Sequence, residues 1–287
     1  MKRVFLFLMM FFIAFPAFSG HRGLKIVTTY PPIQSLVWAV TEGVMPVNLM
    51  FSRPQEQHHN VQLKPSQMKI LQGADIVFYA SDDLETFMKD AISAVAPKAK
   101  VFSFADEIPN LNLLPSALDP EKKDVHYWLD YRNALLMTDK IAEIMIKEDP
   151  KNEKKYLENA EKSKNYIEGL QQESNVDSNK KFMAFHEGFD YLADCFGLDI
   201  KTSPVDIENI NTPKLFDEVK KQIQQENADC FLVEPQTSER ILKSLNLRGK
   251  NVVKLDAFGW NISSGVGQYY QMMRWNLERM SRCKAKK

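Results

Sequence analysis

The chain of 287 residues has little cysteine and little glycine, with three of the former and 11 of the latter. So little cysteine excludes a small scaffold held by several disulfides, and the absence of any C-x-x-C pair argues against a cysteine-ligated metal site. The low glycine content excludes collagen. There is also no G-x-x-x-x-G-K-[ST] phosphate loop and no G-x-S-x-G nucleophile elbow. Nucleotide turnover and serine hydrolysis therefore have no motif in this sequence.

An excess of charge of one sign is also missing, because 37 Lys and Arg balance 37 Asp and Glu. Without a basic excess the chain is not expected to bind nucleic acid, which requires neutralisation of many phosphates. Apolar residues make up 44% of the chain, enough for a real core. At this length about two domains are expected.

A long apolar run occurs only at the start, where residues 4–18 are apolar apart from a break at Pro16 and follow two basic residues. Small residues then occupy the positions that a signal peptidase reads before a cut after Ser19 or Gly20. The alternative is an uncleaved membrane anchor, but the run is shorter than the roughly 20 residues of a bilayer span. Residues 1–20 are therefore predicted to be a signal peptide and the mature protein to be exported.

Export changes the interpretation of the cysteines, because disulfides persist in an oxidising compartment. Three is an odd number, so one cysteine should stay unpaired. Cys230 begins an apolar run and Cys283 lies near the end of the chain, so a bond between them would tie the C-terminus to the second half. Cys195, beside Phe196 in an amphipathic segment, is interpreted as a small core residue.

Short apolar and β-branched runs recur along both halves of the chain, and most intervals between them carry a helical pattern. This alternation is typical of parallel sheets buried on both faces by helices. Two α/β lobes are predicted, over residues 21–148 and 179–287, each with a four-stranded parallel sheet. The expected strands are Leu24 to Thr28, Val47 to Phe51, Ala74 to Tyr79, Lys100 to Phe104, Lys181 to Phe185, Leu198 to Lys201, Ala228 to Val233 and Asn251 to Leu255.

One long helix is predicted to join the lobes, within a linking segment at residues 149–178. Asp149 would be its N-cap and Pro150 its first residue, and the pattern continues to Gln172 with Gly169 as its only glycine. A packed helix of this length should limit the lobes to small rocking motions. Its buried stripe is expected to consist of Tyr156, Leu157, Ala160, Ser163, Ile167 and Leu170.

Histidine is scarce, with only five residues, and three of them fall near the ends of predicted strands. His186 and Asp256 directly follow strands of the second half, while His59 and His126 lie in segments that follow strands of the first. Ligands of open α/β sheets bind beyond the carboxyl ends of the strands. These four side chains are therefore predicted to converge in the cleft between the lobes.

Three imidazoles and one carboxylate form a nitrogen-rich site that suits zinc best among biological metals, although other borderline ions also fit. Binding requires neutral imidazoles, so the affinity should fall as the pH drops through about 6.5. Asp124 and Glu187 are close in sequence to His126 and His186. They are candidates to hydrogen-bond these two rings and orient them.

At these residues the chain resembles a known family, the zinc and manganese ABC-transporter substrate-binding proteins of cluster A-I. The resemblance covers essentially the whole mature chain, and its motifs occur in the family's order. The matching segments are His59 with Pro65-Ser66, Asp124-Val125-His126-Tyr127-Trp128-Leu129-Asp130, Phe185-His186-Glu187, Glu234-Pro235-Gln236 and Leu255-Asp256.

The resemblance implies a periplasmic, non-enzymatic protein, expected to be a monomer, that carries a metal ion to an ABC permease in the membrane. The family's four ligand segments correspond here to His59, His126, His186 and Asp256. Members similar to zinc importers place His at the third position, where manganese importers usually place Glu, so His186 favours zinc. Some zinc-type members also carry a disulfide in the position of Cys230 and Cys283.

Three alternatives to this interpretation stay open. His58 stands where the family often has Pro, so it could face the metal in place of His59, although the spacing to Pro65 favours His59. The same scaffold could carry manganese or iron. A zinc hydrolase is the third alternative, because His186-Glu187 begins like H-E-x-x-H, but the fifth position is Asp190 and the second helical ligand is missing.

Overall fold

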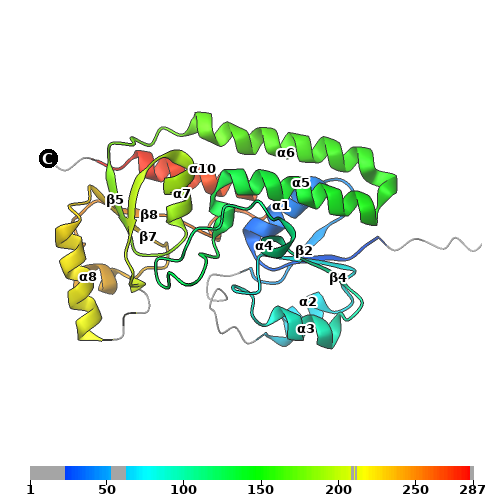
Figure 1. The fold of residues 1–287 in the computed structure, drawn as a ribbon, viewed down its shortest axis with the longest axis horizontal. Coiled ribbons are helices and arrows are strands. Elements are labelled where there is room, and N and C mark those ends of the chain that lie inside the picture. The colour runs from blue at the N-terminus through cyan, green and yellow to red at the C-terminus, as the bar shows by residue number, and fades with distance from the viewer. Residues whose placement is uncertain (1–22, 53–62, 208–209, 211, 285–287) are drawn as a thin grey trace, which may run out of the picture.

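The computed structural model describes residues 23–52, 63–207, 210 and 212–284 and contains two four-stranded parallel sheets flanked by helices (Figure 1). Strands occur at all eight positions expected from the sequence, with ends that differ by up to two residues. The first sheet has the order β2-β1-β3-β4 and the second the order β6-β5-β7-β8. The strands are β1 (Ile26–Thr28), β2 (Val47–Leu49), β3 (Ile76–Tyr79), β4 (Lys100–Ser103), β5 (Lys181–Ala184), β6 (Asp199–Thr202), β7 (Cys230–Val233) and β8 (Val252–Lys254).

Helices connect the strands, as parallel pairing requires, because a parallel neighbour can be reached only by a crossover. The predicted fold class is therefore confirmed, whereas the exact limits of the two lobes stay predictions. The helices are α1 (Pro31–Thr41), α2 (Pro65–Leu71), α3 (Met88–Val95), α4 (Phe104–Glu107), η2 (Tyr127–Leu129), α5 (Tyr131–Glu148), η3 (Pro150–Asn152), α6 (Glu153–Glu173), α7 (Phe189–Phe196), α8 (Pro213–Gln225), α9 (Glu239–Ser244) and α10 (Gln268–Ser281).

The long joining helix is α6, which begins later than predicted. Pro150 starts the short 3-10 turn η3, and α6 follows from Glu153. Asp149 does not cap the backbone; its carboxylate accepts hydrogen bonds from Asn152 Nδ2 (2.6 Å) and the Tyr156 hydroxyl (2.7 Å). The expected buried stripe is also wrong at one position, since Leu157 is 51% exposed.

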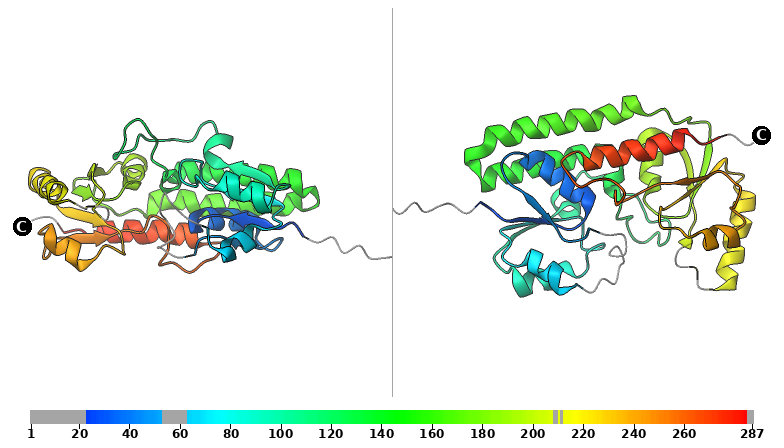
Figure 2. Two further views of the ribbon diagram at one scale, coloured as in Figure 1. Left: turned by 90° about the horizontal axis from the view of Figure 1, so that it is seen from below. Right: turned by 180° about the vertical axis from the view of Figure 1, so that it is seen from behind.

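A second connection between the lobes is made by α10 and the segment before it. Figure 2 shows α10 running beneath α6, and both helices contact α1. On α1 the Ser35 hydroxyl donates to Gly265 O (3.0 Å) and accepts from Tyr269 N (2.9 Å). The chain therefore passes from the second sheet back onto the first lobe before α10 returns.

The disulfide between Cys230 and Cys283 is present and ties the end of α10 to β7. Cys195 is buried and unpaired, as expected for a core residue. Among the residues that the structure describes, no helix combines the length and the apolar character needed to cross a bilayer.

Removal of this disulfide should lower the free energy of unfolding. The bond closes a loop of 53 residues, for which the chain-entropy model gives about 4 kcal/mol as an upper figure. Urea unfolding of the double variant Cys230→Ser, Cys283→Ser should show a loss of about 2–4 kcal/mol. Cys195→Ala, which removes a free thiol, is the control and should cost about 1 kcal/mol. Equal losses in the two variants would contradict the prediction.

Candidate functional site

The structure brings together two of the predicted ligands, one from each lobe. His126 lies in the segment before η2, and His186 lies two residues beyond β5. Their ring centroids are 5.0 Å apart with an interplanar angle of 71°. Both rings are largely removed from solvent, so few water molecules compete for their nitrogens.

Asp124 orients the His126 ring, as the sequence suggested. Its Oδ1 atom lies 2.7 Å from His126 Nδ1 and also accepts a hydrogen bond from the His126 backbone N (2.9 Å). A ring that donates from Nδ1 to a carboxylate presents the lone pair of Nε2. Burial lowers the pKa of His126, but the Asp124 carboxylate more than offsets this effect, and the net direction is upward from 6.5.

The carboxylate beside His186 is not the one predicted. Glu234, buried directly after β7, places Oε2 at 3.4 Å from His186 Nδ1 and accepts a hydrogen bond from Gln236 Nε2 (2.7 Å). Glu187 instead binds the Ser116 hydroxyl and accepts from Leu118 N (3.0 Å), so it holds the loop before Asp124. Because β7 is the hydrogen-bonded neighbour of β5, Glu234 and His186 end at the same sheet edge.

Aromatic rings surround His126. Trp128 and Phe258 each lie 5.5 Å from it between ring centroids, with interplanar angles of 66° and 81°. Trp128 belongs to the same segment as His126, whereas Phe258 comes from the second lobe. Trp128 Nε1 donates to Ala257 O (2.8 Å), which links the two aromatic residues through the backbone. These rings fix the imidazole plane and lower the local dielectric constant around it.

Gly188 allows the close approach of the two histidine segments. Its φ is +97°, and a Cβ at this position would lie 2.6 Å from His126 Cβ and 2.8 Å from Cγ. Real Cβ contacts are never this short, so only glycine fits both the conformation and the space. Gly188 was not among the residues predicted from the sequence to form the site. The signal that could have found it is a glycine two residues after a strand-end histidine.

The other two predicted ligands differ in status. His59 and its alternative His58 lie outside the described residues, so their positions stay predictions. Asp256 is 1% exposed at the end of β8. Its carboxylate accepts four hydrogen bonds, from the backbone N of Phe258, Gly259 and Asn261 and from Asn261 Nδ2.

Within residues 23–52, 63–207, 210 and 212–284, no three His, Cys, Asp or Glu side chains are grouped so that they could hold a metal ion. His126 and His186 therefore form a pair, to which the described part of the chain does not add Asp256. His59, the remaining sequence candidate, stays a prediction.

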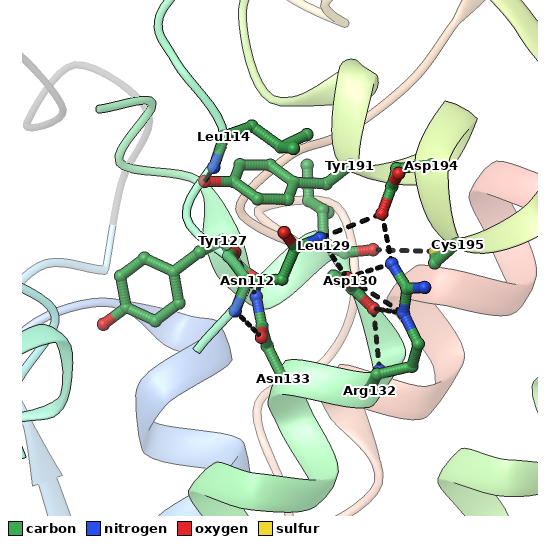
Figure 3. A network of polar contacts seen from close by, with 10 residues as sticks. All are labelled: Asn112, Leu114, Tyr127, Leu129, Asp130, Arg132, Asn133, Tyr191, Asp194 and Cys195. Carbon is green, nitrogen blue, oxygen red and sulfur yellow. Dashed lines mark hydrogen bonds and ion pairs between the residues drawn. The ribbon is translucent and has the colours of Figure 1, made fainter. Parts of the chain in front are cut away.

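A polar network beside the site holds the lobes together (Figure 3). Asp130 caps α5 and binds Arg132, and both Arg132 and Asn112 contact Asp194 on α7. The Tyr191 hydroxyl, also on α7, donates to Asp124 O (2.7 Å). The second lobe therefore fixes the backbone of the residue that orients His126.

The chain is similar to known proteins over most of its length. The family model described as "Zinc-uptake complex component A periplasmic" matches residues 26–283. The manganese ABC transporter substrate-binding lipoprotein PsaA of Streptococcus pneumoniae is 25% identical over 278 residues, 92% of this chain and 89% of PsaA. The high-affinity zinc uptake system protein ZnuA of Haemophilus ducreyi is 23% identical over 293 residues, 90% of this chain and 92% of that protein.

Solved structures share the fold. FpvC of Pseudomonas aeruginosa in complex with Mn²⁺ has a TM-score of 0.77 at 19% identity, covering 91% of this chain and 97% of FpvC. The periplasmic zinc-binding protein TroA of Treponema pallidum has a TM-score of 0.75 at 18% identity, covering 92% of this chain and 99% of TroA. At these identities the likeness concerns the fold alone.

Proposed function

Because the chain belongs to the family of periplasmic zinc-uptake components, with a family model that matches residues 26–283, we propose that it captures a zinc ion between its lobes. The protein then delivers the ion to an ABC permease in the membrane. It acts as a monomer and performs no chemistry on its cargo. Residues 1–20 direct its export to the periplasm and are removed there.

One observation carries this proposal: a buried imidazole, His126, and a largely buried one, His186, one from each lobe, lie 5.0 Å apart between ring centroids, each with a carboxylate next to Nδ1. Carboxylates in this position are the usual outer partners of metal-binding histidines, because they fix the tautomer and raise the basicity of Nε2. We propose His126 and His186 as ligands together with His59. Asp256, the fourth predicted ligand, is left out of this set, because its carboxylate accepts four hydrogen bonds within its own turn.

Zinc is favoured over manganese and iron by the chemistry of the donors. Imidazole nitrogens suit zinc, whereas Mn²⁺ prefers carboxylate and carbonyl oxygens. Two relatives of this chain are substrate-binding lipoproteins of a manganese and an iron ABC transporter, namely PsaA and MtsA of Streptococcus pyogenes. Transport of manganese or iron is therefore the second candidate function.

Metal analysis of the purified exported protein tests the proposal. We expect about one zinc per chain and a strong preference for zinc over manganese in competition with a chromogenic chelator. His59→Ala, His126→Ala and His186→Ala should each weaken zinc binding by more than roughly a hundredfold, since the loss of an outer partner alone costs 10–100-fold. His21→Ala is the control for loss of a histidine outside the proposed ligand set, and His58→Ala tests the alternative ligand.

The same assay decides between the alternatives. His186→Glu should shift the preference toward manganese, because it replaces a nitrogen donor by oxygen. If the parent protein carries no zinc, or if the triple histidine variant still binds it, the proposed function is wrong. A larger loss of zinc affinity in His58→Ala than in His59→Ala would assign the third ligand to His58.

Zinc binding should depend on pH through His126. Zinc needs the neutral ring, and a pKa raised above 6.5 means that protons displace the ion at a higher pH than for free histidine. In the metal-free protein the sign is opposite: the stabilising Asp124–His126 contact is complete below about pH 6.5 and is lost as the pH rises through the folded pKa.

Asp124→Asn removes the group that raises this pKa. We expect proton competition to begin at a lower pH and the affinity at pH 8 to fall roughly tenfold. Zinc competition titrations between pH 5 and pH 8 measure both effects. The control is Asp149→Asn, a buried aspartate at the start of the α6 region. Binding by the parent that is constant from pH 8 to pH 5 would contradict the prediction.

A further inference from the structure

Asp256, which was predicted from the sequence to be a metal ligand, has another role in the turn after β8. A carboxylate offers about four lone-pair positions, and all four of those on Asp256 are used by donors of its own turn, at 2.7–3.1 Å. A carboxylate that accepts so many hydrogen bonds would have to break them to bind an ion. Its geometry fits a turn anchor better than a ligand.

The anchor is itself fixed to α10. The Asp256 backbone N donates to Asn276 Oδ1 (2.8 Å), and Asn276 Nδ2 donates back to Asp256 O (2.9 Å). Asn276 is fully buried, so these two bonds are shielded from water. In addition, Gln268 Nε2 donates to Gly259 O (3.0 Å). Residues 256–261, named here the aspartyl turn, are thus held in one shape.

The aspartyl turn presents two aromatic side chains to the first lobe. Phe258 packs edge-on against His126 and lies 5.3 Å from Trp128 and 5.2 Å from Tyr30 between ring centroids. Trp260 stacks on Phe258 at 5.6 Å and meets Tyr30 at 6.3 Å. The turn is therefore the wall of the site on the side of His126 that faces the second lobe.

We propose that Asp256 is a positioning residue for metal binding: its carboxylate holds the aspartyl turn, and the turn holds Phe258 against the His126 ring. This inference rests on the proposed function, because it assigns a role within the same site. Loss of the carboxylate loosens the turn and lets the His126 ring change its orientation. The affinity for the metal ion then falls, although no ligand has been removed. The same turn therefore both orients the His126 ring and takes part in the contact between the lobes.

The experiment compares Asp256→Asn, Phe258→Leu and their combination with the parent. We expect each single variant to bind zinc roughly tenfold more weakly, the range found for outer partners of metal ligands. The combined variant should be no weaker than the weaker single one, because both changes act through one contact. X-ray absorption at the zinc edge should show the same number of nitrogen and oxygen neighbours in all of them.

A metal-free measurement separates this inference from the proposed function. The imidazole NMR signals of His126 should shift in both single variants of the apo protein and stay unchanged in Asp149→Asn. If Asp256→Asn fails to fold, Asn261→Ala removes one of the four bonds and provides the same comparison. Loss of one oxygen neighbour in Asp256→Asn, or unchanged affinity and His126 signals, overturns the inference. A parent protein that binds no zinc overturns the proposed function, whereas the apo NMR shifts still report whether Asp256 positions His126.

Discussion

Gly188→Ala is expected to lower the free energy of unfolding by about 2–5 kcal/mol and to weaken zinc binding by more than roughly a hundredfold. Two costs add. A φ of +97° is strained for alanine, and the new Cβ would meet His126 Cβ at 2.6 Å and Cγ at 2.8 Å. Relief requires the His126 segment to move away from His186. Urea unfolding of the metal-free protein and zinc competition measure the two effects.

Gly197→Ala is the matched control for this variant. Gly197 ends α7 with a φ of +65°, and no atom lies within 4 Å of the position of its Cβ. It should show only the backbone cost, about 1–2 kcal/mol, with zinc affinity unchanged. Equal losses of affinity in the two variants would mean that crowding of His126 is not the cause.

Trp128→Ala should cause the second large effect, a loss of about 3–5 kcal/mol in the free energy of unfolding. The side chain is fully buried, packs against both His126 and Phe258, and donates from Nε1 to Ala257 O in the other lobe. Its removal leaves a cavity where the lobes meet and an unpaired buried carbonyl. Chemical unfolding followed by circular dichroism measures the loss.

Two further variants show whether this loss comes from the contact between lobes. Trp275→Ala, on the partly exposed face of α10 beneath Arg279, should cost well under half as much. Trp128→Phe keeps most of the packing and loses the hydrogen bond, for which about 1–3 kcal/mol is expected. A Trp128→Ala variant as stable as Trp275→Ala would show that the indole does not link the lobes.

The sequence predicted what depends on local pattern. Continuous apolar runs located the strands, because a parallel sheet buried on both faces admits few polar residues. His186 was found by its place after β5, and Asp124 by its distance of two residues from His126. The pairing of Cys230 with Cys283 also agrees with the structure.

Which carboxylate lies beside each histidine of the site depends on the direction of the side chains, and the spacing of residues along the sequence does not give that direction. Glu187 follows His186 directly but points to the loop at Ser116, whereas Glu234, from the neighbouring strand, faces the imidazole. Knowledge that β5 pairs with β7 would have indicated Glu234. Asp256 lies at a strand end as predicted, but the backbone N–H groups of its own turn compete for its oxygens.

Two helices, α6 and α10, run alongside both lobes, and this arrangement has a consequence for unloading. Because α6 and α10 contact each other and both contact α1, we expect them to resist bending together and to limit the lobes to small movements. Metal–nitrogen bonds, however, weaken steeply when donors shift by fractions of an ångström. A permease that tilts one lobe slightly, against the resistance of α6 and α10, would therefore release the bound ion without unfolding the binding protein.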